Sequence, residues 1–114
     1  MAEIPAHIAS LLKAYISDLE KDLAIQRVVL FGSYARGNHR TDSDIDLAVF
    51  SDSFRGKRFV DIVGFLLSKS RRYKADLEPL GFTFEEYLDS EGNDFMQQIK
   101  KEGVEIYSDG RFVL

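Results

Sequence analysis

The chain has 114 residues, 45% of them hydrophobic and 30% charged, with two prolines, a composition typical of one globular domain rather than a disordered chain. It contains no cysteine, which excludes a disulfide framework and a thiolate metal site. The formal net charge is -4, so the chain lacks the basic excess with which proteins neutralise the phosphates of long nucleic acid. We therefore expect no long nucleic acid as a partner.

Targeting segments are not evident in the sequence. The first residues show no basic stretch followed by an apolar run, and no segment approaches 18 consecutive apolar residues. We therefore expect no secretory signal and no membrane span. The expectation is a cytoplasmic protein whose residues 1–114 form a single domain.

The first half of the chain predicts one long helix and two strands. Between residues 5 and 23, apolar residues recur at helical steps of three and four: Ile8, Leu11, Leu12, Tyr15, Ile16 and Leu19. Residues 28–31 predict a short buried strand that ends at Gly32, and residues 33–37 predict a tight turn leading into a short helical piece. Residues 38–43, including Asp42, predict a polar turn. Residues 44–49 alternate with the period of a second strand.

The second half predicts further helices and strands in alternation. Residues 59–67 carry apolar side chains at helical steps, and residues 75–80 predict a third strand in which Pro79 favours an edge or a strand end. Later boundaries follow from capping and turn signals: Thr83 with Glu86 as a capping box, Asn93 and Gly103 at the two ends of the last helix, and Asp109-Gly110 as a hairpin turn. The expected fold class is α/β (α+β), a mixed β-sheet flanked by helices.

Asp44 and Asp46 are the first candidates for chemistry. On a strand they project from the same face, while Ile45 and Leu47 point into the core. Two such carboxylates repel by roughly 4 kcal/mol at an effective dielectric constant near 20, unless a cation bridges them or one is protonated. Carboxylate oxygens at this spacing suit Mg²⁺ or Mn²⁺, which commonly join protein carboxylates to substrate phosphates.

Gly32-Ser33 closes the first predicted strand. Glycine leaves room for a phosphate, and amides at the start of a short helix point outward as anion donors. By itself a Gly-Ser pair is usually a turn, and this one is not a P-loop because no Gly-Lys-Ser/Thr follows.

Together these segments resemble a known family. GSYARG at residues 32–37 and SDIDLAVF at residues 43–50 are similar to the signature of the DNA polymerase beta-type nucleotidyltransferases, above all the minimal MNT-type members. Ten residues separate the Gly-Ser from the Asp-x-Asp, as in that family's pattern. The resemblance implies the polymerase beta-like nucleotidyltransferase palm fold and covers residues 28–50 most strongly.

The resemblance also implies a third carboxylate on a neighbouring strand. Asp76 is the best match, and Glu78 is the alternative because it shares the same strand face. By this resemblance Asp44, Asp46 and Asp76 hold two Mg²⁺ ions, Gly32 and Ser33 hold the phosphates of a donor that is ATP by default, and AMP is transferred. Arg36 either assists the triphosphate or pairs with a local acid.

The acceptor is implied only at family level. Many MNT-type proteins of this size act as antitoxins beside a helical HEPN protein, some by AMPylation of a tyrosine of the HEPN toxin, and we expect this role here. Two alternatives remain open. One is a binding module that neutralises its partner by covering it. The other is the catalytic subunit of a small-molecule nucleotidyltransferase.

Overall fold

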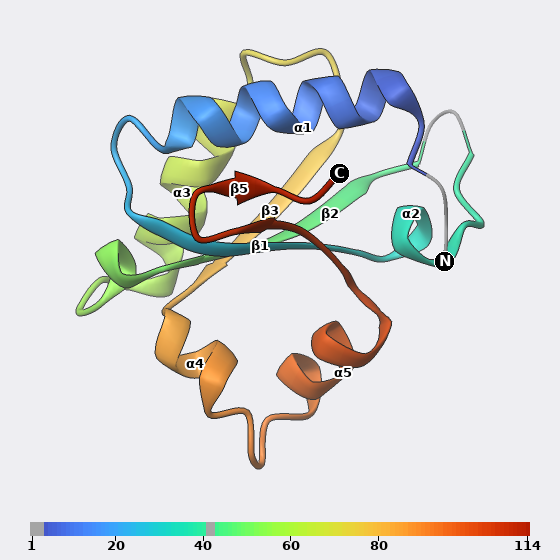
Figure 1. Ribbon diagram of the computed structural model, residues 1–114. Coiled ribbons are helices and arrows are strands. Elements are labelled where there is room, and N and C mark those ends of the chain that lie inside the picture. The colour runs from blue at the N-terminus through green and yellow to red at the C-terminus, as the bar shows by residue number, and fades with distance from the viewer. Residues whose placement is uncertain (1–3, 41–42) are drawn as a thin grey trace.

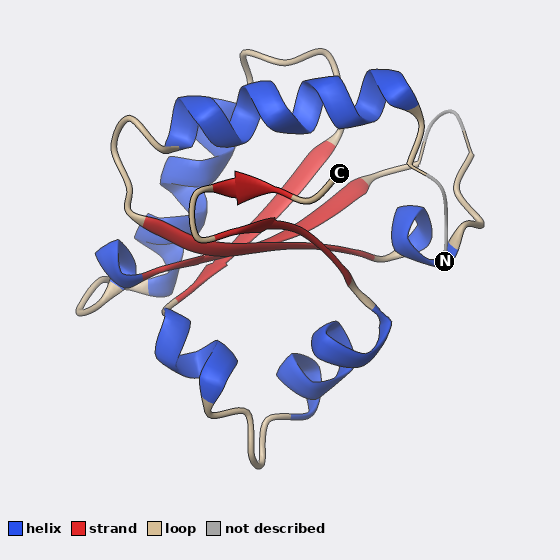
Figure 2. Cartoon of the chain, in the orientation of Figure 1, coloured by secondary structure: helices blue, strands red, loops and turns tan. Residues whose placement is uncertain are grey.

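The computed structural model describes residues 4–40 and 43–114, and the chain alternates helices with strands (Figures 1 and 2). The helices are α1 (Ala6–Leu19), α2 (Ser33–Arg36), α3 (Phe59–Ser70), α4 (Phe84–Leu88) and α5 (Asp94–Glu102), with a short 3-10 turn at Asp52–Phe54. The strands are β1 (Ile25–Phe31), β2 (Ile45–Ser51), β3 (Leu77–Phe82), β4 (Val104–Ser108) and β5 (Arg111–Phe112).

The five strands form one mixed sheet in the order β3-β2-β1-β4-β5. Among these strands only β2 and β3 run parallel, and α3 supplies the crossover that parallel neighbours require. The mixed sheet with flanking helices confirms the expected α+β class.

Pro79 lies in β3, at the edge of the sheet. Ile45 N–H donates to the Asp76 carbonyl at 2.8 Å, so Asp76 turns its backbone toward β2. Successive residues of a strand direct their N–H and C=O groups to alternate sides. The nitrogen of Pro79, which carries no hydrogen, therefore faces away from β2, and the ladder loses no hydrogen bond.

Helices cover both faces of the sheet. Helices α1 and α3 lie on one face, here called the first face, and α4 and α5 lie on the other, the second face (Figure 1). The first face holds the larger core, whose members from α1, the central strands and α3 include Leu12, Tyr15, Ile16, Leu19, Val28, Leu30, Ile45, Leu47, Val49 and Leu66. The buried Tyr15 hydroxyl donates to the Leu66 carbonyl at 2.8 Å and ties α1 to α3.

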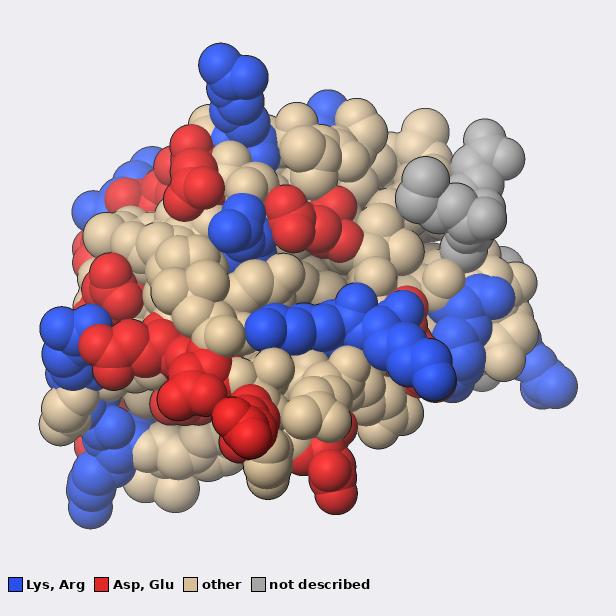
Figure 3. Space-filling model, turned by 60° about the horizontal axis from the view of Figure 1, so that its bottom comes forward, with Lys and Arg blue, Asp and Glu red and all other residues tan. Residues whose placement is uncertain are grey.

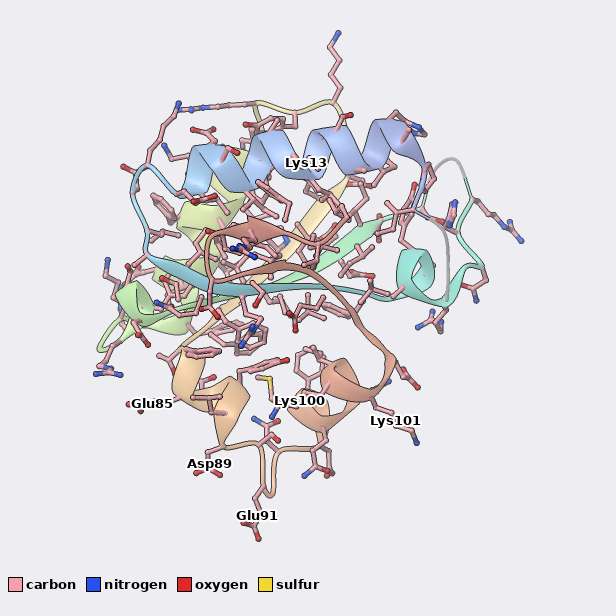
Figure 4. The ribbon with its side chains drawn as sticks, in the orientation of Figure 1. Lys13, Glu85, Asp89, Glu91, Lys100 and Lys101 are labelled. Carbon is pink, nitrogen blue, oxygen red and sulfur yellow. The ribbon has the colours of Figure 1, made fainter. Side chains whose placement is uncertain are left out.

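The second face is apolar over only part of its length. Val29, Ala48 and Phe50 pack there against Met96 and Ile99 of α5. Lys100 joins the two helices of this layer, because its ammonium group lies 4.7 Å from the ring centre of Tyr87 and donates to Ser90 Oγ at 3.2 Å (Figure 4). Toward the start of β2 the same face carries Asp46 instead of an apolar residue.

The predicted boundaries agree with the structure at the capped ends. Thr83 Oγ1 accepts from Glu86 N–H at 3.4 Å, and Asn93 Oδ1 accepts from Met96 N–H at 3.0 Å. Asp109 and Gly110 have φ of 46° and 89°, which are the positive angles of a two-residue hairpin turn.

Other boundaries differ by a few residues. Strand β1 begins at Ile25, three residues before the predicted start at residue 28. Ile25 pairs with Ser51 beyond an irregularity in the ladder, which the local sequence does not indicate. Strand β3 spans 77–82 rather than 75–80, so Asp76 immediately precedes it, and helix α3 continues to Ser70. Asp42 of the predicted turn lies outside the described residues. Within the described ranges, no helix combines the length and hydrophobicity needed to cross a membrane.

Candidate active site

Asp44 and Asp46 lie at the start of β2. Ile45 and Leu47 are buried in the first-face core, at 1% and 0% exposure, so the side chain of Asp46 between them lies on the second face. Asp46 is half-buried, whereas Asp44, just before the strand, is exposed. The strand alternation read from the sequence therefore separates the acidic side chains from the core.

The parallel pairing of β2 with β3 brings more carboxylates to the same place. Asp46 lies opposite Glu78 in the register, and Asp76 is joined to Ile45 by the backbone hydrogen bond described above. One carboxylate oxygen from each of Asp44, Asp76 and Glu78 lies within 4.8 Å of the others. The structure thus brings both candidates for the third carboxylate, Asp76 and Glu78, to Asp44.

Burial and mutual repulsion shift the pKa values of two of these carboxylates. Burial and the neighbouring Asp44 raise the pKa of Asp46, and Arg36 opposes that shift. Burial and the nearby Asp44, Asp76 and Asp46 raise the pKa of Glu78. A divalent cation with oxygen ligands relieves this repulsion, so the donor set fits Mg²⁺ or Mn²⁺.

Charge elsewhere on the second-face side is mixed. In the view that brings this side forward, a row of acidic side chains lies beside a band of basic ones, and further side chains of both signs are scattered around them (Figure 3). The labelled Glu85, Asp89 and Glu91 of α4 and the loop after it point away from the sheet (Figure 4). These three acidic side chains are exposed and lie apart from the strand carboxylates, and Glu85 pairs with Arg55 at 2.8 Å.

Gly32 lies against Asp46. Its backbone has φ 74° and ψ -153°, a region that is almost restricted to glycine. A Cβ added at Gly32 would lie 2.1 Å from Asp46 Oδ2, closer than any side chain allows. The glycine therefore lets the β1–α2 turn approach the carboxylate directly.

A cavity of about 290 Å³ opens beside this contact. It is lined by Phe31, Gly32, Arg36, Asp46, Phe95, Gln98, Ile99 and Glu102. Of the residues predicted to bind nucleotide, Gly32 and Arg36 line the cavity, whereas the half-buried Ser33 is the first residue of α2 and is not part of the lining.

Helix α5 forms the wall that sequence reasoning missed. Phe95, Gln98 and Glu102 come from a segment that is more than fifty residues away from Gly32 and has no phosphate-binding motif. The only local signal is the strong amphipathic pattern of the helix, which indicates a buried face but not what it faces.

A second cavity, of about 470 Å³, lies on the other side of the carboxylates. Asp44, Asp46 and Glu78 line it together with six apolar side chains from β1, α3, β3 and α5: Phe31, Val63, Leu67, Pro79, Leu80 and Phe95. Asp46 borders both cavities, so a molecule in either one reaches the same carboxylate.

A strand-borne carboxylate cluster facing a glycine-serine turn is typical of enzymes that transfer nucleotides with the help of divalent metal ions. The sequence pattern described as "Polymerase beta, Nucleotidyltransferase" matches residues 13–111, and the chain belongs to this nucleotidyltransferase family.

Solved structures share the fold. A presumed nucleotidyltransferase from Sulfolobus solfataricus superposes with a TM-score of 0.70 at 19% sequence identity, over 95% of this chain and 88% of that one. A chain of a toxin-antitoxin complex crystallised with AMP-PNP has a TM-score of 0.56 at 22% identity, over 84% of this chain and 73% of that one. No curated protein shows significant sequence similarity.

Proposed function

We propose that the chain transfers a nucleoside monophosphate, AMP from ATP by default, to a hydroxyl group of an acceptor. The observation that carries the proposal is the close approach of Gly32 to the Asp46 carboxylate. Asp46 pairs in register with Glu78, which forms a cluster of three carboxylates with Asp44 and Asp76. Family membership supports the reaction class. The AMP-PNP in the crystals of the toxin-antitoxin neighbour, an analogue of ATP, supports the choice of nucleotide.

Each part of the site has a task in such a transfer. Asp44, Asp46 and Asp76 would hold two Mg²⁺ ions, which when bound neutralise the triphosphate and favour ionisation of the attacking hydroxyl. Gly32 leaves space for the phosphates beside Asp46. Ser33 and the first amides of α2 follow this glycine but do not line the cavity, so hydrogen bonds from them to the phosphates remain a prediction. Arg36, in the same cavity, would bind the pyrophosphate that leaves.

Each of the two cavities would hold one of the two substrates. The cavity lined by Gly32 and Arg36 would hold the triphosphate, and the cavity lined by Glu78 and apolar side chains would receive the acceptor. Asp46 borders both, which allows the attacking and leaving oxygens to lie in line across it.

The third carboxylate is tested by two separate substitutions. We expect Asp76→Asn to lower metal-dependent transfer by about a hundredfold or more, because a lost ligand removes charge stabilisation in the transition state. We expect Glu78→Gln to lower it by only about tenfold, the lower end of the loss that is typical of an outer-shell partner. Turnover measured over a Mg²⁺ titration separates the two, and a larger loss in Glu78→Gln would make Glu78 the third ligand instead.

For the acceptor we propose a HEPN-type helical protein, AMPylated by this chain in the manner of an antitoxin. The structural similarity to a toxin-antitoxin chain supports this assignment. The experiment incubates the protein with ATP, Mg²⁺ and the purified product of the neighbouring reading frame, and then weighs that product by mass spectrometry. Adducts in multiples of AMP are expected, and they should disappear with EDTA. An unchanged mass in the complete reaction contradicts protein AMPylation.

The same toxin-antitoxin similarity favours one other function, neutralisation by binding alone. The double variant Asp44→Asn with Asp46→Asn distinguishes the two, because it removes charge from the site without removing any partner-facing apolar residue. Under the transfer proposal the variant no longer protects cells from the partner. Full protection by the variant would establish the binding module.

A further inference from the structure

Helix α3 carries an apolar face that the core does not use. Its inner residues Ile62 and Leu66 are buried, at 6% and 0% exposure. On the outer side, Val60 is 67% and Leu67 37% exposed, with the half-buried Val63 between them. The spacing of i, i+3 and i+7 aligns these three side chains along one side of the helix, as in helices that dock against a partner helix.

Gly64 lies within this outer face. A glycine in a helix interior is unfavourable relative to alanine, yet a Cβ added at Gly64 would meet no heavy atom within 4 Å. Packing within the described chain therefore gives no reason for a glycine there. An exposed glycine between apolar side chains permits close approach by the backbone of another molecule.

A series of phenylalanine rings connects this face to the candidate active site. Ring centres are 6.4 Å apart between Phe59 and Phe82, 6.1 Å between Phe82 and Phe95, and 5.9 Å between Phe95 and Phe31. Phe31 directly precedes Gly32. Phe59 and Phe95 are 53% and 42% exposed, so the series forms a surface that leads from α3 to the site.

The larger cavity joins the same surface to the carboxylates. Val63 and Leu67 of α3 line it on one side of β3, and Phe95 of α5 lines it on the other, with Asp44, Asp46 and Glu78 between them. A residue that enters this cavity from a partner seated on α3 therefore reaches the carboxylates.

We propose that the acceptor surface, defined as Phe59, Val60, Val63, Gly64, Leu67 and Phe95, docks an apolar helix of the acceptor protein and delivers its hydroxyl residue into this cavity. The proposal rests on the proposed function. It commits to a helix because Pro79 lacks the outward N–H that a strand added to β3 would need. It commits to a protein because the six residues of the acceptor surface include no lysine or arginine with which to neutralise the phosphates of a nucleic acid.

The test measures binding of the full-length chain to the purified product of the neighbouring reading frame by calorimetry, without ATP. Val60→Ser and Leu67→Ser are each expected to weaken binding by about tenfold. Their matched controls are Val113→Ser and Leu88→Ser, which remove valine and leucine side chains of 52% and 63% exposure away from this surface. The controls should bind as the unmodified chain does.

Gly64→Ala gives a readout that misfolding cannot imitate. The variant is expected to raise the melting temperature, because alanine favours the helix and its methyl group meets no heavy atom within 4 Å, and yet to weaken binding about tenfold. Unchanged binding in Gly64→Ala and in both serine variants overturns the proposal, as does no binding by the unmodified chain. A stable dimer of this chain that Leu67→Ser dissociates also overturns it, since the surface would then pair two copies.

The docking result is separable from transfer. The double variant Asp44→Asn with Asp46→Asn should lose transfer and still bind the partner, and this binding should still depend on Val60 and Leu67. Binding that depends on the acceptor surface, without any AMP adduct in the complete reaction, would contradict the transfer proposal and support the docking surface alone.

Discussion

Asp46→Asn is expected to lower nucleotide transfer by at least about a thousandfold, since bound metal ions contribute several kcal/mol of charge stabilisation in the transition state. Asp46 is the carboxylate that borders both cavities, and its Oδ2 is the atom nearest to the position that a Cβ at Gly32 would take. Asparagine keeps the shape of the side chain but removes the negative charge. Transfer of labelled nucleotide over a Mg²⁺ titration measures the loss.

The same substitution should stabilise the metal-free protein. Burial and Asp44 raise the pKa of Asp46 in the folded chain, so the folded state binds the proton more tightly than the unfolded state does. Stability therefore falls as pH rises through this raised pKa, and the cost is fully present above it. An asparagine side chain does not titrate, so the variant should melt at a higher temperature than the unmodified chain at pH 7 and lose this part of the pH dependence.

Adding Mg²⁺ with nucleotide should reverse the order, because ligands that bind only the folded state stabilise it. Asp89→Asn is the control, since Asp89 is exposed at the end of α4 and points away from the sheet (Figure 4). It should leave transfer and the effect of Mg²⁺ unchanged. Near-normal turnover in Asp46→Asn would show that Asp46 is not a metal ligand.

Short-range signals accounted for most of the fold. The alternation of Asp44, Ile45, Asp46 and Leu47 was sufficient to predict which side chains enter the core, because a strand has a fixed period of two. The cap at Asn93 and the turn at Asp109 were equally local, since each depends on one side chain or one pair of backbone angles.

Long-range features could not be predicted in the same way. The alignment of Asp46 with Glu78 depends on the register between β2 and β3, which are separated by the whole of α3. Sequence alone left Asp76 and Glu78 as alternatives for the third carboxylate. The structure places both of them in one cluster with Asp44. Placement of Phe95 and Gln98 beside Gly32 depends on how α5 packs over the second face, which periodicity does not specify.

Gly32→Ala is expected to abolish most transfer without unfolding the chain. The backbone angles at Gly32 cost a residue with a Cβ about 1–3 kcal/mol, which a folded domain of ordinary stability can absorb. The new methyl group would also lie 2.1 Å from Asp46 Oδ2 and 3.0 Å from its Cγ, so the carboxylate must move. A displacement of about 1 Å in a reacting group costs on the order of a hundredfold in rate.

Gly92→Ala separates these two effects. Gly92 also has a positive φ, of 77°, but a Cβ added there meets no heavy atom within 4 Å. Both variants should therefore lose stability from backbone strain in urea denaturation, whereas only Gly32→Ala should lose transfer and the stabilisation by Mg²⁺ with nucleotide. If the two variants retain equal activity, Asp46 can be repositioned freely, and the close approach of the glycine turn does not align the reaction. If Gly32→Ala alone is inactive while still folded, the loss comes from the displaced carboxylate rather than from backbone strain.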